Sequence, residues 1–236
     1  MGLFDFLKIE ETIEKYIDEF GRGNFQNMKE FANCCSKRND KQVFLKACKD
    51  FAAICTHKDF ESIKDFLASA DEDSLQMFLP CISDTRSLQS IPYLLALMEK
   101  WGNTEIGIMI HRIIMDMLGK PCDVVKADVE ECGREFAEFS KNHDLQQYYF
   151  KGQVINYGEF TKKLILIAMS CKNANQPFFG GEISNLFKIS FGIECPVKDG
   201  EMVTDEKVAQ IFAFVKKIAD INPKPGAKYY LGKKIG

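Results

Sequence analysis

The 236-residue sequence lacks most of the patterns that mark enzyme chemistry. It contains no GxSxG, GxxxxGK[ST] or GxGxxG motif, so neither a hydrolase nucleophile nor a phosphate-binding loop is indicated. The three histidines, His57, His111 and His143, lie far apart, and none has metal-ligating neighbours at the usual spacing. We therefore predict a non-enzymatic protein with no catalytic residue, no cofactor and no metal.

Long apolar runs are also missing. The longest one, Leu164 to Met169, is far shorter than the ~20 residues that span a bilayer. The opening MGLFDFLKIEE has neither the basic start nor the apolar stretch of a secretory signal, and Phe6 replaces the Ser or Thr of a myristoylation site. These features predict a soluble, cytoplasmic protein with no membrane partner.

Basic residues are not in excess, and the cysteines form no framework. The formal charge is −3, from 31 basic and 34 acidic residues, which disfavours general binding to nucleic acid. The nine cysteines include no CxxC pair, and an odd number without regular spacing is typical of reduced cytosolic thiols. We interpret the adjacent Cys34 and Cys35 as ordinary helix residues, with a redox or metal role as the alternative.

The strongest pattern in the sequence is a pair of helices between Ser87 and Gly119. Ile91, Leu94, Leu95 and Met98 share one helical face, and Gly102 ends that helix. The second helix is apolar on most sides, and its polar residues form one narrow stripe of Glu105, Arg112 and Asp116. A helix of this kind is buried by other helices, so the pair should form the centre of the fold.

Helical periodicity recurs along most of the chain, and four of the predicted helices have a candidate N-cap residue: Asp40, Ser90, Asn156 and Thr204. We predict an all-α fold of antiparallel helix pairs, either a HEAT-like α-solenoid or an irregular bundle. The Asp199-Gly200 step predicts one small β-hairpin near the C-terminus, over 196–203. We expect a single helical domain over 1–236, with a soft boundary that could lie near 120–123, and an irregular basic tail over 224–236.

One predicted helix is highly charged on its outer face. It should open at Asp123 and place Val125, Val129, Cys132, Phe136 and Phe139 along an inner seam. Asp123, Glu130, Glu131 and Glu135 contribute to the acidic outer face, and the aromatic residues Trp101, Tyr148 and Tyr149 are expected near loops. The acidic side chains could simply be solvated, and the aromatic ones could be core edges. Together they also match a binding surface, with aromatic anchors ringed by charges that speed encounter with a basic protein.

The stretches Tyr148-Tyr149-Phe150-Lys151-Gly152 and Ser90-Ile91-Pro92-Tyr93-Leu94-Leu95 to Trp101, with Glu105-Ile106 after it, resemble bacterial Imm-type immunity proteins. These are helical antidotes to polymorphic or contact-dependent toxins, and the similarity covers Ser87 to Ser170. It implies a non-enzymatic cytosolic protein that binds and blocks a cognate toxin. The acidic surfaces would suit a basic nuclease toxin, and the family supplies no catalytic residues.

Two other functions fit the same helical pattern. One is a helical-repeat repair enzyme such as a HEAT-like DNA glycosylase, which would need a basic concave face containing an aromatic residue and a carboxylate. The net acidic charge disfavours it, and no nucleic-acid partner is expected. The other is a scaffold or adaptor protein, which the sequence does not separate from an antidote.

Overall fold

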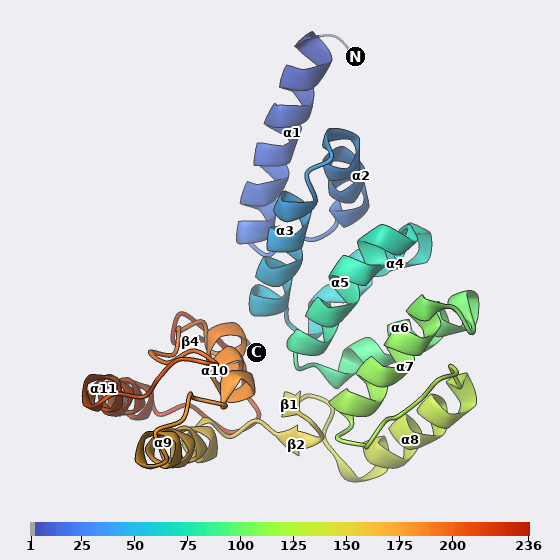
Figure 1. Ribbon diagram of the computed structural model, residues 1–236. Coiled ribbons are helices and arrows are strands. Elements are labelled where there is room, and N and C mark those ends of the chain that lie inside the picture. The colour runs from blue at the N-terminus through green and yellow to red at the C-terminus, as the bar shows by residue number, and fades with distance from the viewer. Residues whose placement is uncertain (1–2) are drawn as a thin grey trace. The chain divides into compact units, whose positions relative to one another are not determined.

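The computed structural model describes residues 3–236, which divide into two compact units after Gln153 (Figure 1). This division falls between Gln153 and Val154, whereas the sequence indicated a soft boundary near 120–123. Most of the described residues are helical, and two small antiparallel two-stranded sheets complete the secondary structure. The prediction of an all-α fold is confirmed.

The first unit contains eight α-helices within the described residues. They are α1 (Leu3–Gly21), α2 (Met28–Arg38), α3 (Lys41–Ile54), α4 (Lys64–Ser69), α5 (Glu72–Asp84), α6 (Ile91–Trp101), α7 (Glu105–Met117) and α8 (Val129–Asn142). Three 3-10 turns join them: His57–Asp59, Glu61–Ile63 and Leu88–Ser90. Strand β1 (Tyr149–Phe150) pairs with β2 (Gln153–Val154) where the first unit ends.

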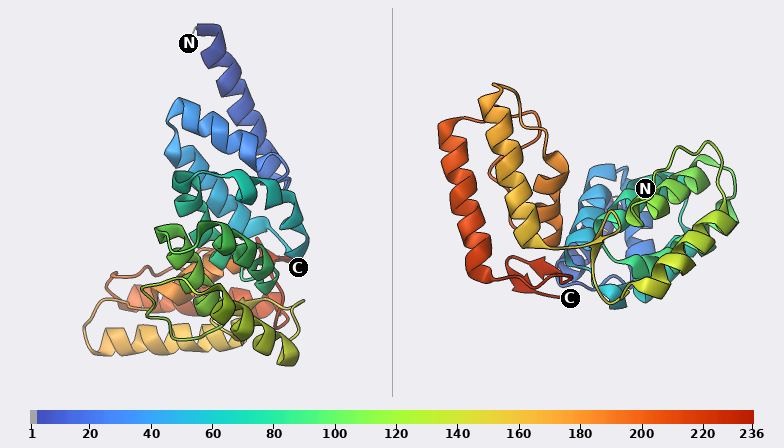
Figure 2. Two further views of the ribbon diagram at one scale, coloured as in Figure 1. Left: turned by 90° about the vertical axis from the view of Figure 1, so that its right-hand side faces the viewer. Right: turned by 90° about the horizontal axis from the view of Figure 1, so that it is seen from below.

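The helices of this unit stack in two layers, which Figure 2 shows from two further sides. In one layer α3 packs between α1 and α5, and α5 packs on α7; in the other, α4 contacts α2 and α6, and α6 contacts α8. Most consecutive helices of this unit are joined by short connections, so neighbours along the chain run in opposite directions. This is the stack of antiparallel helix pairs that the sequence predicted.

Aromatic rings fill the space between the first helices. Phe31 packs against Phe20 and Phe44, and Phe78 packs against Phe51 and Phe66, with ring centroids 4.9–6.1 Å apart. Such pairs contribute ~0.5–1.5 kcal/mol each beyond the area that they bury. The rings thus link successive layers of the stack into one continuous core.

The central pair, α6 and α7, is buried as predicted. The side chains on its inner faces are completely inaccessible to solvent: Ile91, Leu94, Met98, Ile106, Ile110 and Ile114. Thr104 caps α7 by accepting a hydrogen bond from the Gly107 N–H. Ser90, expected to cap α6, instead donates its hydroxyl to the Ser87 carbonyl, because its own backbone is already helical.

Helix α8 begins later than predicted. The seam from Val125 suggested a start at Asp123, but residues 121–128 form a loop and the helix starts at Val129. Arg112 Nη2 donates to the Val124 carbonyl at 2.8 Å, which holds this loop in an extended path beside α7. Val125 therefore points away from the core and is 88% exposed.

The second unit contains α9 (Tyr157–Asn173), α10 (Gly181–Ser190) and α11 (Asp205–Ile221), followed by β3 (Tyr229–Tyr230) and β4 (Lys233–Lys234). Helices α9 and α11 lie side by side (Figure 2). Asn156 and Thr204 cap them as predicted. Tyr157 is buried in the centre, where its hydroxyl donates to the Ser190 carbonyl at 2.7 Å and lies 3.2 Å from the Ala227 carbonyl.

The small β-hairpin predicted near the C-terminus is present, but it is β3–β4 and not residues 196–203. There the chain turns at Asp199-Gly200 and bonds to another segment: the Phe178 N–H donates to the Glu201 carbonyl and the Gly200 N–H to the Phe178 carbonyl, both at 2.8 Å. The tail over 224–236 is ordered and supplies the C-terminal hairpin, β3–β4. It is fixed by tertiary contacts, including the Tyr157 hydroxyl and a hydrogen bond from the Gly226 N–H to the Ile155 carbonyl.

Candidate functional site

The acidic helix α8 is held to the core by the residue that caps its start. The Asp128 carboxylate caps the helix by accepting from the Glu131 N–H at 2.9 Å, while the Asp128 N–H donates to Nδ1 of His111 at 3.1 Å. His111 lies on α7 and is fully buried. Because Nδ1 accepts this hydrogen bond, the ring proton sits on Nε2, which lies 3.6 Å from the Glu131 carboxylate. The buried helix α7 therefore sets where the acidic helix starts.

The predicted acidic residues differ in how their charges are compensated. Glu135 forms an ion pair with Lys120 at 2.9 Å, and this contact lowers the pKa of the Glu135 carboxyl and raises that of Lys120. Asp123 and Glu130 are exposed, and neither has an ion-pair partner among the described residues. The face therefore keeps net negative charge in contact with water.

Trp101 lies beside the start of α8. It ends α6 and is half-buried, and its indole N–H is buried without a hydrogen-bond acceptor in the described part of the chain. Asn103, two residues later, accepts a hydrogen bond from the Ala127 N–H at 3.0 Å. This bond joins the turn after Trp101 to the loop that precedes α8.

Tyr148 and Tyr149 are buried and therefore unavailable as surface anchors. Tyr148 stacks on the His57 ring with centroids 4.1 Å apart, and burial raises the pKa of its hydroxyl. Tyr149 packs edge-on against Phe139 of α8 and donates its hydroxyl to the Asp144 carbonyl at 3.0 Å. The aromatic run expected near a loop instead anchors the C-terminal end of α8 to the core.

A groove between α5 and α7 was not predicted as a site. Its volume is about 760 Å³, and its lining combines Pro80, Ile108, Met109 and Ile113 with the charged residues Asp84, Glu105, Arg112 and Asp116. The sequence did contain a signal for it, since Glu105, Arg112 and Asp116 form the one polar stripe on α7. Glu105 has no hydrogen bond or ion pair within the described residues, so its carboxylate is available in the groove.

The candidate site thus consists of an acidic helix, a neighbouring tryptophan and a groove with acidic edges, all on elements of the first unit. The sequence model of a family described as Immunity protein 47 matches residues 5–235, almost the whole chain. The chain belongs to the immunity protein 47 family. No curated protein and no solved structure matches it.

Membership in the immunity protein 47 family gives the chain an antidote-type immunity function and implies a toxin as its partner. The resemblance inferred from the middle of the sequence is confirmed, and the match extends well beyond Ser87–Ser170. Among the described residues, no helix combines the length and apolar character that crossing a bilayer requires.

The histidines of this immunity protein 47 chain make structural contacts. His57 lies 2.6 Å from the Ser87 hydroxyl and 2.8 Å from the Gln146 carbonyl, and His143 Nδ1 lies 2.8 Å from the Phe139 carbonyl. In the part of the chain that the structure describes, no three potential metal ligands come together. All nine cysteines are free; Cys35 is buried in α2, and burial raises the pKa of its thiol to about 12, which makes it a poor nucleophile.

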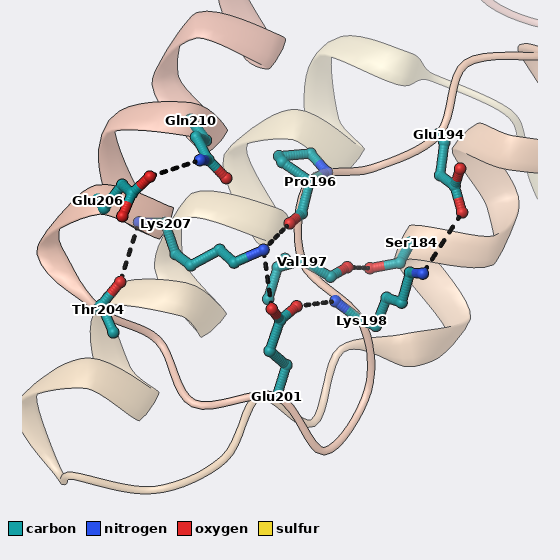
Figure 3. Close-up of polar contacts among 10 residues, drawn as sticks. All are labelled: Ser184, Glu194, Pro196, Val197, Lys198, Glu201, Thr204, Glu206, Lys207 and Gln210. Atoms are coloured by element: carbon teal, nitrogen blue, oxygen red, sulfur yellow. Dashed lines mark hydrogen bonds and ion pairs between the residues drawn. The ribbon is translucent and has the colours of Figure 1, made fainter.

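A polar network in the second unit fixes a loop (Figure 3). Lys207 of α11 donates to the Pro196 carbonyl and forms an ion pair with Glu201, both at 2.8 Å, and Glu201 also accepts from the Lys198 N–H. The contact with Lys207 lowers the pKa of the Glu201 carboxyl. These charges satisfy one another, and the network positions residues 196–204 against α11.

Proposed function

We propose that this immunity protein 47 chain is a non-enzymatic antidote that binds one cognate toxin domain and blocks it in the bacterial cytoplasm. The family match over residues 5–235 is the observation that carries the proposal. The stacked helix pairs, which we assign to a HEAT-like solenoid, supply a rigid surface for such binding. No observation favours the repair-enzyme or scaffold alternatives.

The acidic face of α8 is the part of the surface that we assign to the toxin. Glu130, Glu131 and Glu135 lie on the helix itself, whose start is fixed by the Asp128–His111 contact, while Asp123 lies in the loop before it and Trp101 beside its start. Exposed carboxylates on a fixed helix attract a basic protein and accelerate its association. A basic toxin domain is therefore the partner that this surface fits.

The first test is recovery of the partner. The tagged protein is used to capture binding proteins from its own source, with the products of adjacent genes as the first candidates. One stoichiometric toxin whose activity the antidote suppresses would support the proposal. Recovery of nucleic acid, or of no protein, would refute it.

The second test concerns the surface. Replacing Glu130, Glu131 and Glu135 by Gln should weaken toxin binding roughly tenfold, at ~0.5 kcal/mol per surface charge pair formed with the toxin, and reduce its dependence on salt. The matched control replaces three exposed acids of α1, Glu11, Glu14 and Asp18, by their amides. If both triple variants bind the toxin like the parent, the toxin contacts another surface.

A further inference from the structure

The outward face of helix α11 has an unusual composition. Positions 205, 209, 212, 213 and 216 share one side of the helix, opposite the buried Ile211, Phe214 and Ile218. This face carries Ala209, Phe212 and Ala213 between Asp205 and Lys216, and all five are exposed, with Phe212 50% accessible to solvent. Three apolar residues thus occupy the middle of a face that ordinarily is polar.

Helix α9 extends this apolar surface. Lys172 near its end forms an ion pair with Asp205 at the start of α11, so the two helices run in opposite directions. Phe212 lies with Ile165 and Met169 of α9 around a shallow depression, and Leu166 is 69% exposed. The second unit therefore presents an apolar patch that spans two helices. A solvent-exposed patch of this kind typically marks a protein contact.

Acidic side chains occupy the beginning of α11, and basic side chains lie toward its end. Asp205 and Glu206 occupy its first turn, while Lys216 and Lys217 come three turns later and have no ion-pair partner among the described residues. Lys207 lies on another side and is engaged by Pro196 and Glu201 (Figure 3). The acidic end and the basic end are thus separated by the apolar centre.

Because its two ends carry opposite charge, this face of α11 is complementary to the same face of a second copy that runs in the opposite direction. If a second α11 lies antiparallel with Asp205 opposite Lys216, the same register sets Glu206 near Lys217 and Ala209 opposite Phe212. The small alanine side chain leaves room for the phenyl ring, and the two helix dipoles oppose each other favourably. A two-fold dimer requires such self-complementarity, since one patch must contact its own copy.

We propose that two copies of this chain associate through antiparallel α11 helices, with Phe212 at the centre and the Asp205–Lys216 and Glu206–Lys217 pairs at both ends. The partner is defined by charge: an acidic or basic protein would complement only one end of the helix. This association goes beyond toxin neutralisation and does not depend on the identity of the toxin.

The test uses the full chain by itself. Sedimentation velocity between about 1 and 200 µM should show a concentration-dependent species of twice the chain mass of 26.9 kDa. Phe212→Asp should raise the dimer dissociation constant at least about thirtyfold, as loss of a central anchor does. Leu231→Asp, at a 67% exposed leucine of the same unit outside the patch, should leave it unchanged. Circular dichroism confirms that each variant is folded.

Charge variants test the register. Replacing Asp205 and Glu206 by Lys gives a basic face, and replacing Lys216 and Lys217 by Glu gives an acidic one; each variant alone should be monomeric. Their mixture should form a heterodimer, and Phe212→Asp in both should abolish it. A monomeric parent at 200 µM, a dimer insensitive to Phe212→Asp, or a mixture that stays monomeric would each overturn the proposal.

Discussion

Gly107 of the central helix α7 should not tolerate alanine, although alanine is the better helix former. A Cβ atom at Gly107 would lie 1.8 Å from the Gly102 carbonyl oxygen and 2.9 Å from the Gly102 carbonyl carbon. Both atoms are backbone, and Gly102 holds a positive φ of 52° that side-chain-bearing residues rarely adopt. The turn between α6 and α7 therefore has little freedom to move away.

Two effects of opposite sign compete in Gly107→Ala. Replacing glycine by alanine within a helix stabilises it by about 1 kcal/mol. Overpacking against a fixed neighbour costs about 1–3 kcal/mol and more when backbone must shift, which is required at 1.8 Å. The cost of this clash should exceed the gain in helix propensity, and we expect a net loss of roughly 1–2 kcal/mol or more in the free energy of unfolding.

Gly133 of α8 provides the matched control. A Cβ atom there would meet nothing within 4 Å, so only the helix-propensity term remains and Gly133→Ala should stabilise by about 0.5–1 kcal/mol. Thermal melting followed by circular dichroism should show the two Tm values shifted in opposite directions, by about 2–4 °C per kcal/mol. An unchanged or raised Tm for Gly107→Ala would refute the close packing of α7 on the turn at Gly102.

Three further predictions follow from burial, capping and charge. Ile110→Asp or Ile114→Asp should unfold the protein, because both sites are fully buried and an unpaired buried charge costs ~3–5 kcal/mol or more; a native circular dichroism spectrum and Tm for either variant would contradict this. Asp128→Ala should lower the stability of α8 by about 1 kcal/mol through loss of its N-cap, measurable as faster amide exchange in that helix. Lys207→Met should raise the pKa of Glu201 in an NMR carboxyl titration, since Lys207 holds it below its usual value. The stabilising contribution of this pair is present above the ordinary carboxyl pKa and is lost as the pH falls through the lowered one, so the Tm difference between the variant and its parent should shrink in acid.

Local sequence signals determined much of the helical structure. Asp40, Thr204 and Asn156 cap the helices that their positions predicted, because a cap depends on only a few adjacent residues. The burial of α6 and α7 also followed from periodicity, since a helix that is apolar on most sides must be surrounded.

The elements whose position or order was predicted wrongly depend on contacts between residues distant in sequence. The start of α8 moved because Arg112 holds the loop at Val124, and the C-terminal tail is ordered because Tyr157 reaches the Ala227 carbonyl. The burial of Tyr148 likewise depends on His57, far away in the chain. Composition identified the acidic part of the candidate site, but only the packing of α5 on α7 revealed the groove.

Because Asp128 is hydrogen-bonded to the buried His111, the residues that position α8 differ from the residues that present its charge. Position and orientation of this helix come from its capping residue, its buried Cys132 and the core histidine. The exposed Glu130 takes part in none of these contacts, so its replacement should cost little folding stability. An antidote built in this way can acquire specificity for a different toxin by surface substitutions alone, while the scaffold that presents them stays the same.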